Sequence, residues 1–118
     1  VDMWLRRFEL DGFIPLLHAF RNHVPRFAGR VVPGTRTDLP QLPEMVTRGK
    51  EMADVFLARV EPHLANSDFI AGSNFTVADI TAYFTIRLAQ GLEMNLEDSY
   101  PAVAGWFAKV SARPAFEL

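Results

Sequence analysis

The residue types that most often perform catalysis or bind metals are sparse here, and their spacing suits neither task. His18, His23 and His63 lack metal-ligand spacing, because two residues five apart on a helix point about 140° away from each other. Ser73 and Ser111 have no neighbouring His and Asp arrangement that would form a catalytic triad. The chain has no Cys, which excludes disulfides, thiolate metal sites and a cysteine nucleophile. It has no glycine-rich phosphate loop of either common type.

Asp79 is the carboxylate that most resembles a general base, since apolar residues flank it. Thr76 stands three residues before it, however, which is the spacing of a capping box at the start of a helix. Phe75 and Ile80 stand where a hydrophobic staple would place them. We therefore favour a structural role, in which the Asp79→Ala substitution costs about 0.5–2 kcal/mol of stability, as loss of a helix cap does.

Four helices are expected to position these residues, without any strand. The first covers about residues 2–24, with a bend expected at Pro15 because proline lacks the amide that would bond to Asp11. Residues 31–43 hold three prolines and a glycine and indicate a loop. A second helix follows over about residues 41–65, with Pro62 expected to kink or end it. Its expected buried stripe comprises Met45, Gly49, Met52, Ala53, Phe56, Leu57, Val60 and Leu64.

The third helix begins after Thr76 and plausibly ends at Gly91. Its buried face is expected to continue from Ile80 through Phe84 and Leu88. The fourth helix opens at Pro101, a favoured first position, and stops before Pro114. It should bury Val103, Trp106, Phe107 and Val110.

Length and composition indicate one globular domain. The chain has 118 residues, of which 49% are hydrophobic, so it can bury a substantial core. No apolar run approaches the roughly 18 residues of a membrane span, and no secretory signal is evident. The chain begins with Val1 rather than Met, which we interpret as a fragment, a processed product or a cloning boundary.

Charge is unevenly distributed along the chain. Residues 1–36 carry six Arg against three acidic side chains, whereas residues 37–118 carry six basic and eleven acidic side chains. A nucleic-acid binder would need a denser basic stripe with aromatic residues beside it. Solvated helix faces explain the asymmetry most simply. The alternative is that the arginine-rich first segment faces an anionic ligand or a partner subunit.

Several motifs together resemble the C-terminal, all-helical domain of the cytosolic glutathione S-transferase family, bacterial type. The resemblance is clearest from Phe69 to Phe116 and extends over nearly the whole chain. The matching residues are Phe69-Ile70-Ala71-Gly72, Phe75-Thr76-Val77-Ala78-Asp79-Ile80, Tyr100-Pro101, Trp106-Phe107, Ser111-Ala112-Arg113-Pro114, Trp4-Leu5-Arg6-Arg7-Phe8-Glu9 and Ala19-Phe20-Arg21-Asn22.

The resemblance implies an all-α fold, an orthogonal or up-down helical bundle formed by residues 1–118 as a single domain. In the family a thioredoxin-like domain precedes this one, binds most of the glutathione and supplies the Ser, Tyr or Cys that stabilises its thiolate. Nothing here resembles that domain. The implied partners are glutathione as co-substrate, a small hydrophobic electrophile and a second subunit that docks through the first two helices. No metal, nucleic acid or membrane is implied, and the implied location is cytoplasmic.

Candidate ligand contacts follow from the resemblance of the first helix. In some bacterial members, the two residues before a Gly-Phe-x-Pro-Leu segment reach toward glutathione. Here that segment is residues 12–16, which places Leu10 and Asp11 at those positions; relatives carry basic or polar residues there, so Leu10 departs from the pattern. Trp4, Arg7, Phe8 and Asp11 are the candidates for the electrophile pocket. Arg7 and Asp11 could also form only a surface ion pair, worth under about 1 kcal/mol.

Three functions remain open at this point. The first is the electrophile-binding and dimerising half of a glutathione S-transferase, inactive by itself because it lacks the thiol-activating domain. The second is a non-catalytic protein-interaction module, as the same helical domain provides in translation factors and synthetases. The third is a glutathione-dependent reductase, isomerase or dehalogenase of the same family.

Overall fold

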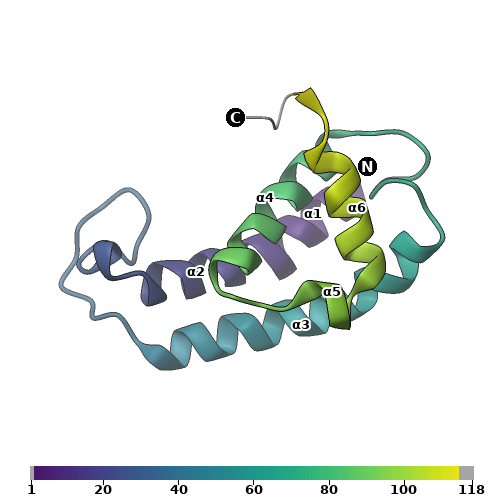
Figure 1. The fold of residues 1–118 in the computed structure, drawn as a ribbon. Coiled ribbons are helices and arrows are strands. Elements are labelled where there is room, and N and C mark those ends of the chain that lie inside the picture. Colours follow the sequence, from purple (N-terminus) through teal and green to yellow (C-terminus); the bar gives the residue numbers. More distant parts are fainter. Residues whose placement is uncertain (1, 115–118) are drawn as a thin grey trace.

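The computed structural model describes residues 2–114 and shows an all-helical bundle (Figure 1). In chain order the helices are α1 (Asp2–Arg7), a π-helical segment η1 (Phe8–Phe13), α2 (Ile14–His23), a 3₁₀ turn η2 (Pro25–Phe27), α3 (Pro43–Ala65), α4 (Val77–Gly91), α5 (Leu96–Ser99) and α6 (Pro101–Ser111). No strand forms within residues 2–114, where the only β-type pairing is a single bridge between Phe69 and Gly72. The all-α prediction is therefore confirmed. Phe116, the last residue of the resemblance, lies outside the described residues.

The predicted first helix forms as a continuous helical run, but its middle is π-helical. The amide of Ile14 bonds to the carbonyl of Glu9, five residues back, instead of the usual four. This widened turn lies directly before Pro15, which has no amide to donate to Asp11, so one α-helical bond is missing there in any case. Gly12 is buried within the π segment. A Cβ at Gly12 would lie 3.1 Å from both the Phe56 ring and Thr85, so glycine lets the first helix approach α3 and α4 closely.

Helix α3 runs antiparallel to α2 along the length of the molecule (Figure 1). It passes through Pro62 and ends three residues later, at Ala65. Two side chains of the predicted buried stripe lie outside the core, since Met45 is 38% and Met52 47% exposed. The rest of that stripe is buried as predicted. The two methionines are seven residues apart, so they lie on the same partly exposed face of α3.

Helix α4 begins after Thr76, as the sequence predicts, and forms a capping box. The Thr76 hydroxyl accepts from the Ala78 amide at 3.2 Å, and Asp79 Oδ2 accepts from the Thr76 amide at 2.9 Å. The predicted buried face was wrong at Ile80 and Phe84, which are 39% and 50% exposed, whereas Leu88 is partly buried against the core. The buried residues of α4 are instead Ala78, Asp79, Ala82, Tyr83, Thr85, Ile86 and Ala89.

The predicted staple between Phe75 and Ile80 stays a prediction. The Phe75 ring packs edge-on against Phe69, with 6.1 Å between centroids, and under the guanidinium of Arg113 at 3.9 Å. Phe69 starts a tight turn in which it exchanges two backbone hydrogen bonds with Gly72. Gly72 has a φ of +139°, a conformation that glycine adopts without strain.

Helix α6 begins at Pro101, as predicted, and is capped from α3. The two carboxylate oxygens of Glu61 accept from the amides of Ala102 and Val103 at 2.7 and 3.0 Å. A negative charge at this position also complements the positive end of the helix dipole. Val103, Trp106 and Val110 are buried as predicted, and Phe107 is partly buried and packs against the core.

Candidate functional site

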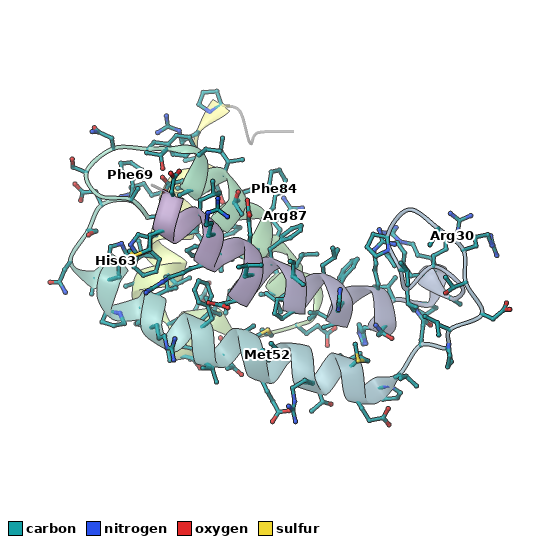
Figure 2. All side chains as sticks on the ribbon, turned by 180° about the vertical axis from the view of Figure 1, so that it is seen from behind. Arg30, Met52, His63, Phe69, Phe84 and Arg87 are labelled. Carbon is teal, nitrogen blue, oxygen red and sulfur yellow. The ribbon has the colours of Figure 1, made fainter. Side chains whose placement is uncertain are left out.

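An apolar groove lies between the first helix and α4. Its volume is about 840 Å³. The first helix contributes Glu9, Phe13, Ile14 and Phe20, and α4 contributes Ile80, Thr81, Phe84, Arg87, Leu88 and Gly91. Ile80 and Phe84, predicted to be core residues, are thus the exposed wall of this groove. Figure 2 shows Phe84 and Arg87 projecting from α4 on the same side of the molecule.

Polar groups in the groove are few. They are the Glu9 carboxylate, the Thr81 hydroxyl and the Arg87 guanidinium. Arg87 Nη1 donates to the Tyr83 hydroxyl at 3.0 Å, which holds the guanidinium beside that ring. Apolar walls with a few polar groups bind hydrophobic ligands or protein surfaces. The groove is thus suited to binding an apolar group.

The predicted contact residues at the start of the first helix form a small aromatic cluster outside the groove. The Trp4 ring stacks on the His63 ring, with 4.3 Å between centroids and 22° between planes. The Arg7 guanidinium lies 5.3 Å from the Trp4 ring centroid. His63 Nε2 in turn donates to the Ile70 carbonyl at 2.6 Å. Trp4 and Arg7 therefore cover the end of α3 and the turn that follows it.

The other predicted contact residues lie in three different environments. Phe8 is buried in the core, edge-on to Phe56 at 4.8 Å between centroids. Leu10 is 61% exposed. Asp11 lines a separate hollow of about 230 Å³ with Met52, Val55, Phe56 and Arg59. The structure therefore does not bring the five predicted residues Trp4, Arg7, Phe8, Leu10 and Asp11 into one pocket, and none of them lines the large groove.

Asp79 is fully buried and connects three parts of the fold. Its Oδ1 accepts from the Ile70 amide at 3.0 Å and from the Trp106 indole at 2.9 Å, and its Oδ2 accepts from the Thr76 amide. Three donors on a carboxylate that solvent cannot reach leave no path for a substrate proton. The geometry supports the structural role that the sequence favours.

The sequence contains a signal for the groove in the two apolar faces of α4. Ile80, Phe84 and Leu88 are the large residues of α4 at four-residue spacing, which by itself predicts a core face. The true core face carries Ala78, Ala82 and Ala89, which are small because the first helix and α6 pack closely against it. A stripe of alanines beside a stripe of larger apolar residues indicates a helix with two contact faces.

The structure contains no obvious metal site and no membrane span in the part it describes. Within residues 2–114, no group of three or more His, Asp or Glu side chains lies close enough to hold a metal ion. None of the helices there combines the length and apolarity needed to cross a bilayer. The fold and the groove together define an all-helical domain with an apolar groove between its first helix and α4.

Comparison with known proteins identifies the family. The sequence model for the glutathione S-transferase C-terminal domain matches residues 31–114. A Gtt2-class glutathione S-transferase of Vibrio parahaemolyticus is similar over 98% of this chain, with 30% identity and a TM-score of 0.77. A glutathione S-transferase domain-containing protein of Marinobacter aquaeolei is similar over 98% of the chain, with 30% identity and a TM-score of 0.75. The chain belongs to the glutathione S-transferase C-terminal domain family.

A third structure, Gtt2 of Saccharomyces cerevisiae, shares the fold at a TM-score of 0.82, with 22% identity over 98% of this chain. The chain covers 48% of the Vibrio protein and 53% of each of the other two. It therefore spans about half the length of these relatives.

Proposed function

We propose that residues 1–118 form the electrophile-binding and dimerising half of a glutathione S-transferase. In this proposal a thioredoxin-like half binds glutathione and activates its thiol, because a thiol needs a nearby donor or positive charge to ionise. The helical half supplies the apolar wall against which a small hydrophobic electrophile lies. Glutathione is then a co-substrate bound mainly by the other half, in a cytoplasmic setting consistent with the absence of cysteine.

The observation that carries this proposal is the apolar groove between the first helix and α4. Phe84 is 50% exposed and Ile80 is 39% exposed. Large apolar side chains exposed in this way often mark a surface that a ligand or another protein surface covers. We propose that the thioredoxin-like half covers part of the groove and leaves the remainder for the electrophile. Trp4, Arg7, Leu10 and Asp11 remain candidates for ligand contact at the outer end of the first helix, whereas buried Phe8 can act only by supporting them.

Dimerisation through the first two helices is the second part of the proposal. Helix α3 exposes Met45, Met52 and Val55, the last of which is 62% exposed. These residues recur at spacings of seven and three, so they lie on one face of the helix. An exposed apolar face of this kind is suited to contact with the same surface of a second copy.

A dye-displacement experiment tests the electrophile-binding role. An apolar fluorescent dye, anilinonaphthalene sulfonate, is bound to the 118-residue chain and displaced with an apolar aryl chloride. We expect displacement from the parent chain and at least fivefold weaker dye binding to the Phe84→Ser variant. The control is Leu39→Ser, which removes a comparably exposed apolar side chain outside the groove (54% against 50%) and should leave dye binding unchanged. Dye that the aryl chloride does not displace, or equal losses in both variants, would contradict the role.

Catalysis is tested separately. The 118-residue chain, mixed with glutathione and an activated aryl chloride, is expected to give no more conjugate than the uncatalysed reaction. Turnover above that background would overturn the assignment of thiol activation to another domain.

The alternative function is a non-catalytic interaction module. The small number of polar groups in the groove supports it, because an apolar groove also suits the apolar face of a partner helix. If the groove bound a partner helix and the aryl chloride did not displace the dye, this alternative would be favoured. A glutathione-dependent reductase, isomerase or dehalogenase would share the helical half and differ in the thiol-activating residue.

A further inference from the structure

Four of the six arginines in residues 1–36 lie at one end of the molecule. Arg21 is in the last turn of α2, and the others are in the connection between α2 and α3, at positions 26, 30 and 36. Figure 1 shows this connection extending beyond the bundle, at the end far from α6, and Figure 2 places Arg30 there, opposite His63 and Phe69. Backbone and side-chain hydrogen bonds fold the connection back on itself. The Thr37 amide donates to the Gly29 carbonyl at 2.9 Å, and Gln41 Nε2 donates to the carbonyls of Arg21 and Val24 at 2.9 and 2.7 Å.

This fold encloses a hollow with a positive lining. Its volume is about 310 Å³, and it is lined by Arg21, Phe27, Arg30, Gly34, Thr35 and Arg36. Three of the six lining residues are arginines, and none is acidic. Gly34 has a φ of +82° and open space where a Cβ would stand, so its backbone leaves room at the edge of the hollow. We call this the arginine hollow.

The three guanidinium groups lack carboxylate partners within residues 2–114. The ion pair found there joins Arg48 to Glu51 on α3, away from the hollow. Arg21 Nη1 donates to the Arg30 carbonyl at 2.9 Å, while Arg21 Nε is buried with no hydrogen-bond partner in the described residues. Like charges brought together without neutralisation repel each other. A bound anion would remove that repulsion and accept charge-assisted hydrogen bonds from the guanidinium groups.

The aromatic residue of the hollow is already engaged, which limits the kind of anion. The Arg21 and Arg26 guanidinium groups lie 4.8 and 5.1 Å from the Phe27 ring centroid, and the Phe20 ring lies 5.8 Å from it. A single-stranded nucleic acid needs an aromatic face on which a base can stack. The volume is also at the lower end of the range for small-molecule pockets. Both observations favour a compact anion over a nucleotide chain.

We propose that the arginine hollow binds a small, multiply charged oxyanion of the phosphate class through Arg21, Arg30 and Arg36. Guanidinium groups match the geometry of phosphate oxygens, which they contact in pairs. Arg21 is held in place by Phe27 and by the Arg30 carbonyl, whereas Arg30 and Arg36 are exposed and can close on the anion. This site is separate from the apolar groove and does not depend on a transferase function.

Calorimetric titration of the 118-residue chain with inorganic pyrophosphate tests the site. We expect saturable binding to one site, weakened at about 0.15 M ionic strength because the charges are exposed to screening. The double variant Arg30→Gln/Arg36→Gln should weaken binding at least tenfold. Its matched control is Arg6→Gln/Arg48→Gln, which removes two guanidinium groups elsewhere and should change the affinity less than twofold. Thermal unfolding of each variant checks that it is folded.

Three outcomes would overturn the proposal. The first is the absence of saturable pyrophosphate binding. The second is an equal loss of affinity in the two double variants, which would mean that binding follows net charge alone. The third is unchanged pyrophosphate affinity in Arg30→Gln/Arg36→Gln accompanied by weaker self-association in sedimentation, which would assign these arginines to contact with a second copy of the chain.

Discussion

The buried carboxylate of Asp79 accepts hydrogen bonds from three different parts of the fold. It joins the turn at Ile70, the start of α4 at Thr76 and the indole of Trp106 on α6. The sequence predicted only the second of these contacts. The other two arise because the chain folds the turn and α6 against the same side chain.

Replacing Asp79 should therefore cost more than the loss of a helix cap. We expect Asp79→Ala to lower the free energy of unfolding by about 3 kcal/mol, since buried donors are left unsatisfied as well. The stability of Asp79→Asn should lie between those of Asp79→Ala and the parent chain. Its side-chain oxygen can still accept hydrogen bonds, whereas its NH₂ group would face the Thr76 amide, which is also a donor. Urea unfolding measures the free energy of unfolding of each variant. The control is Asp38→Ala at an exposed position, which should change stability by less than about 0.5 kcal/mol. A loss of about 1 kcal/mol or less in Asp79→Ala would contradict the three-contact role.

Tyr100 makes stability depend on pH in the alkaline range. Burial, the negative charge of Asp54, the hydrogen bond to that carboxylate and the charge of Glu61 all raise the pKa of Tyr100 above its usual 10.0. The folded chain therefore keeps its phenol proton where the unfolded chain has lost it. The stabilisation is fully present below about pH 10 and is lost as the pH rises through the raised pKa.

The Tyr100→Phe variant isolates this effect. At neutral pH it should lose about 1 kcal/mol, because the hydroxyl no longer donates to Asp54. Its melting temperature should then fall less steeply than that of the parent above about pH 10. Thermal melts followed by circular dichroism across that range give the comparison. Parallel curves for parent and variant would show that Tyr100 does not contribute to the alkaline loss.

At the level of helices, two glycines test how closely the elements pack. A Cβ at Gly49 on α3 would lie 2.6 Å from the Pro15 carbonyl oxygen and 2.7 Å from Ala19 Cβ, whereas a Cβ at Gly105 on α6 would meet nothing within 4 Å. Gly49→Ala should therefore destabilise the chain by about 1–3 kcal/mol through forced separation of α2 and α3. Gly105→Ala should stabilise it by about 0.5–1 kcal/mol. Chemical unfolding measures the stability of both variants. If Gly49→Ala stabilised the chain, α2 and α3 would not be in close contact at this position.

The sequence predicted most of the helix boundaries and most of the buried faces of α3 and α6, but not the buried face of α4. Local chemistry sets the boundaries, as at Thr76 and Pro101, where the cap and the proline act within one turn. Pro15 by itself predicts a bend and not the π-helical segment that precedes it. That segment forms where the missing proline amide and the close contact at Gly12 coincide.

At the level of the whole molecule, the exposed face of α3 and the apolar groove make separable predictions. If dimerisation uses α3, the double variant Met52→Ser/Val55→Ser should raise the dimer dissociation constant at least tenfold, equivalent to about 1.4 kcal/mol. Phe84→Ser should leave that constant within about twofold, because Phe84 lies in the groove. Sedimentation equilibrium over a range of protein concentrations measures both. A parent chain that stays monomeric at the highest concentration would rule out this dimer.

The sequence by itself determined that this protein is all-helical, where its long helices begin, that Asp79 caps α4, and which family its motifs resemble. The first three follow from local chemistry, namely caps, prolines and apolar spacing, which act over a few residues. The resemblance rests on the order and spacing of the matching motifs. Only the tertiary structure decided that Ile80 and Phe84 line a groove, that Phe8 is inaccessible, and that Arg21, Arg30 and Arg36 surround one hollow. An apolar stripe shows that a helix has a contact face, but the neighbouring helices determine whether that face is covered within the chain or left for a partner.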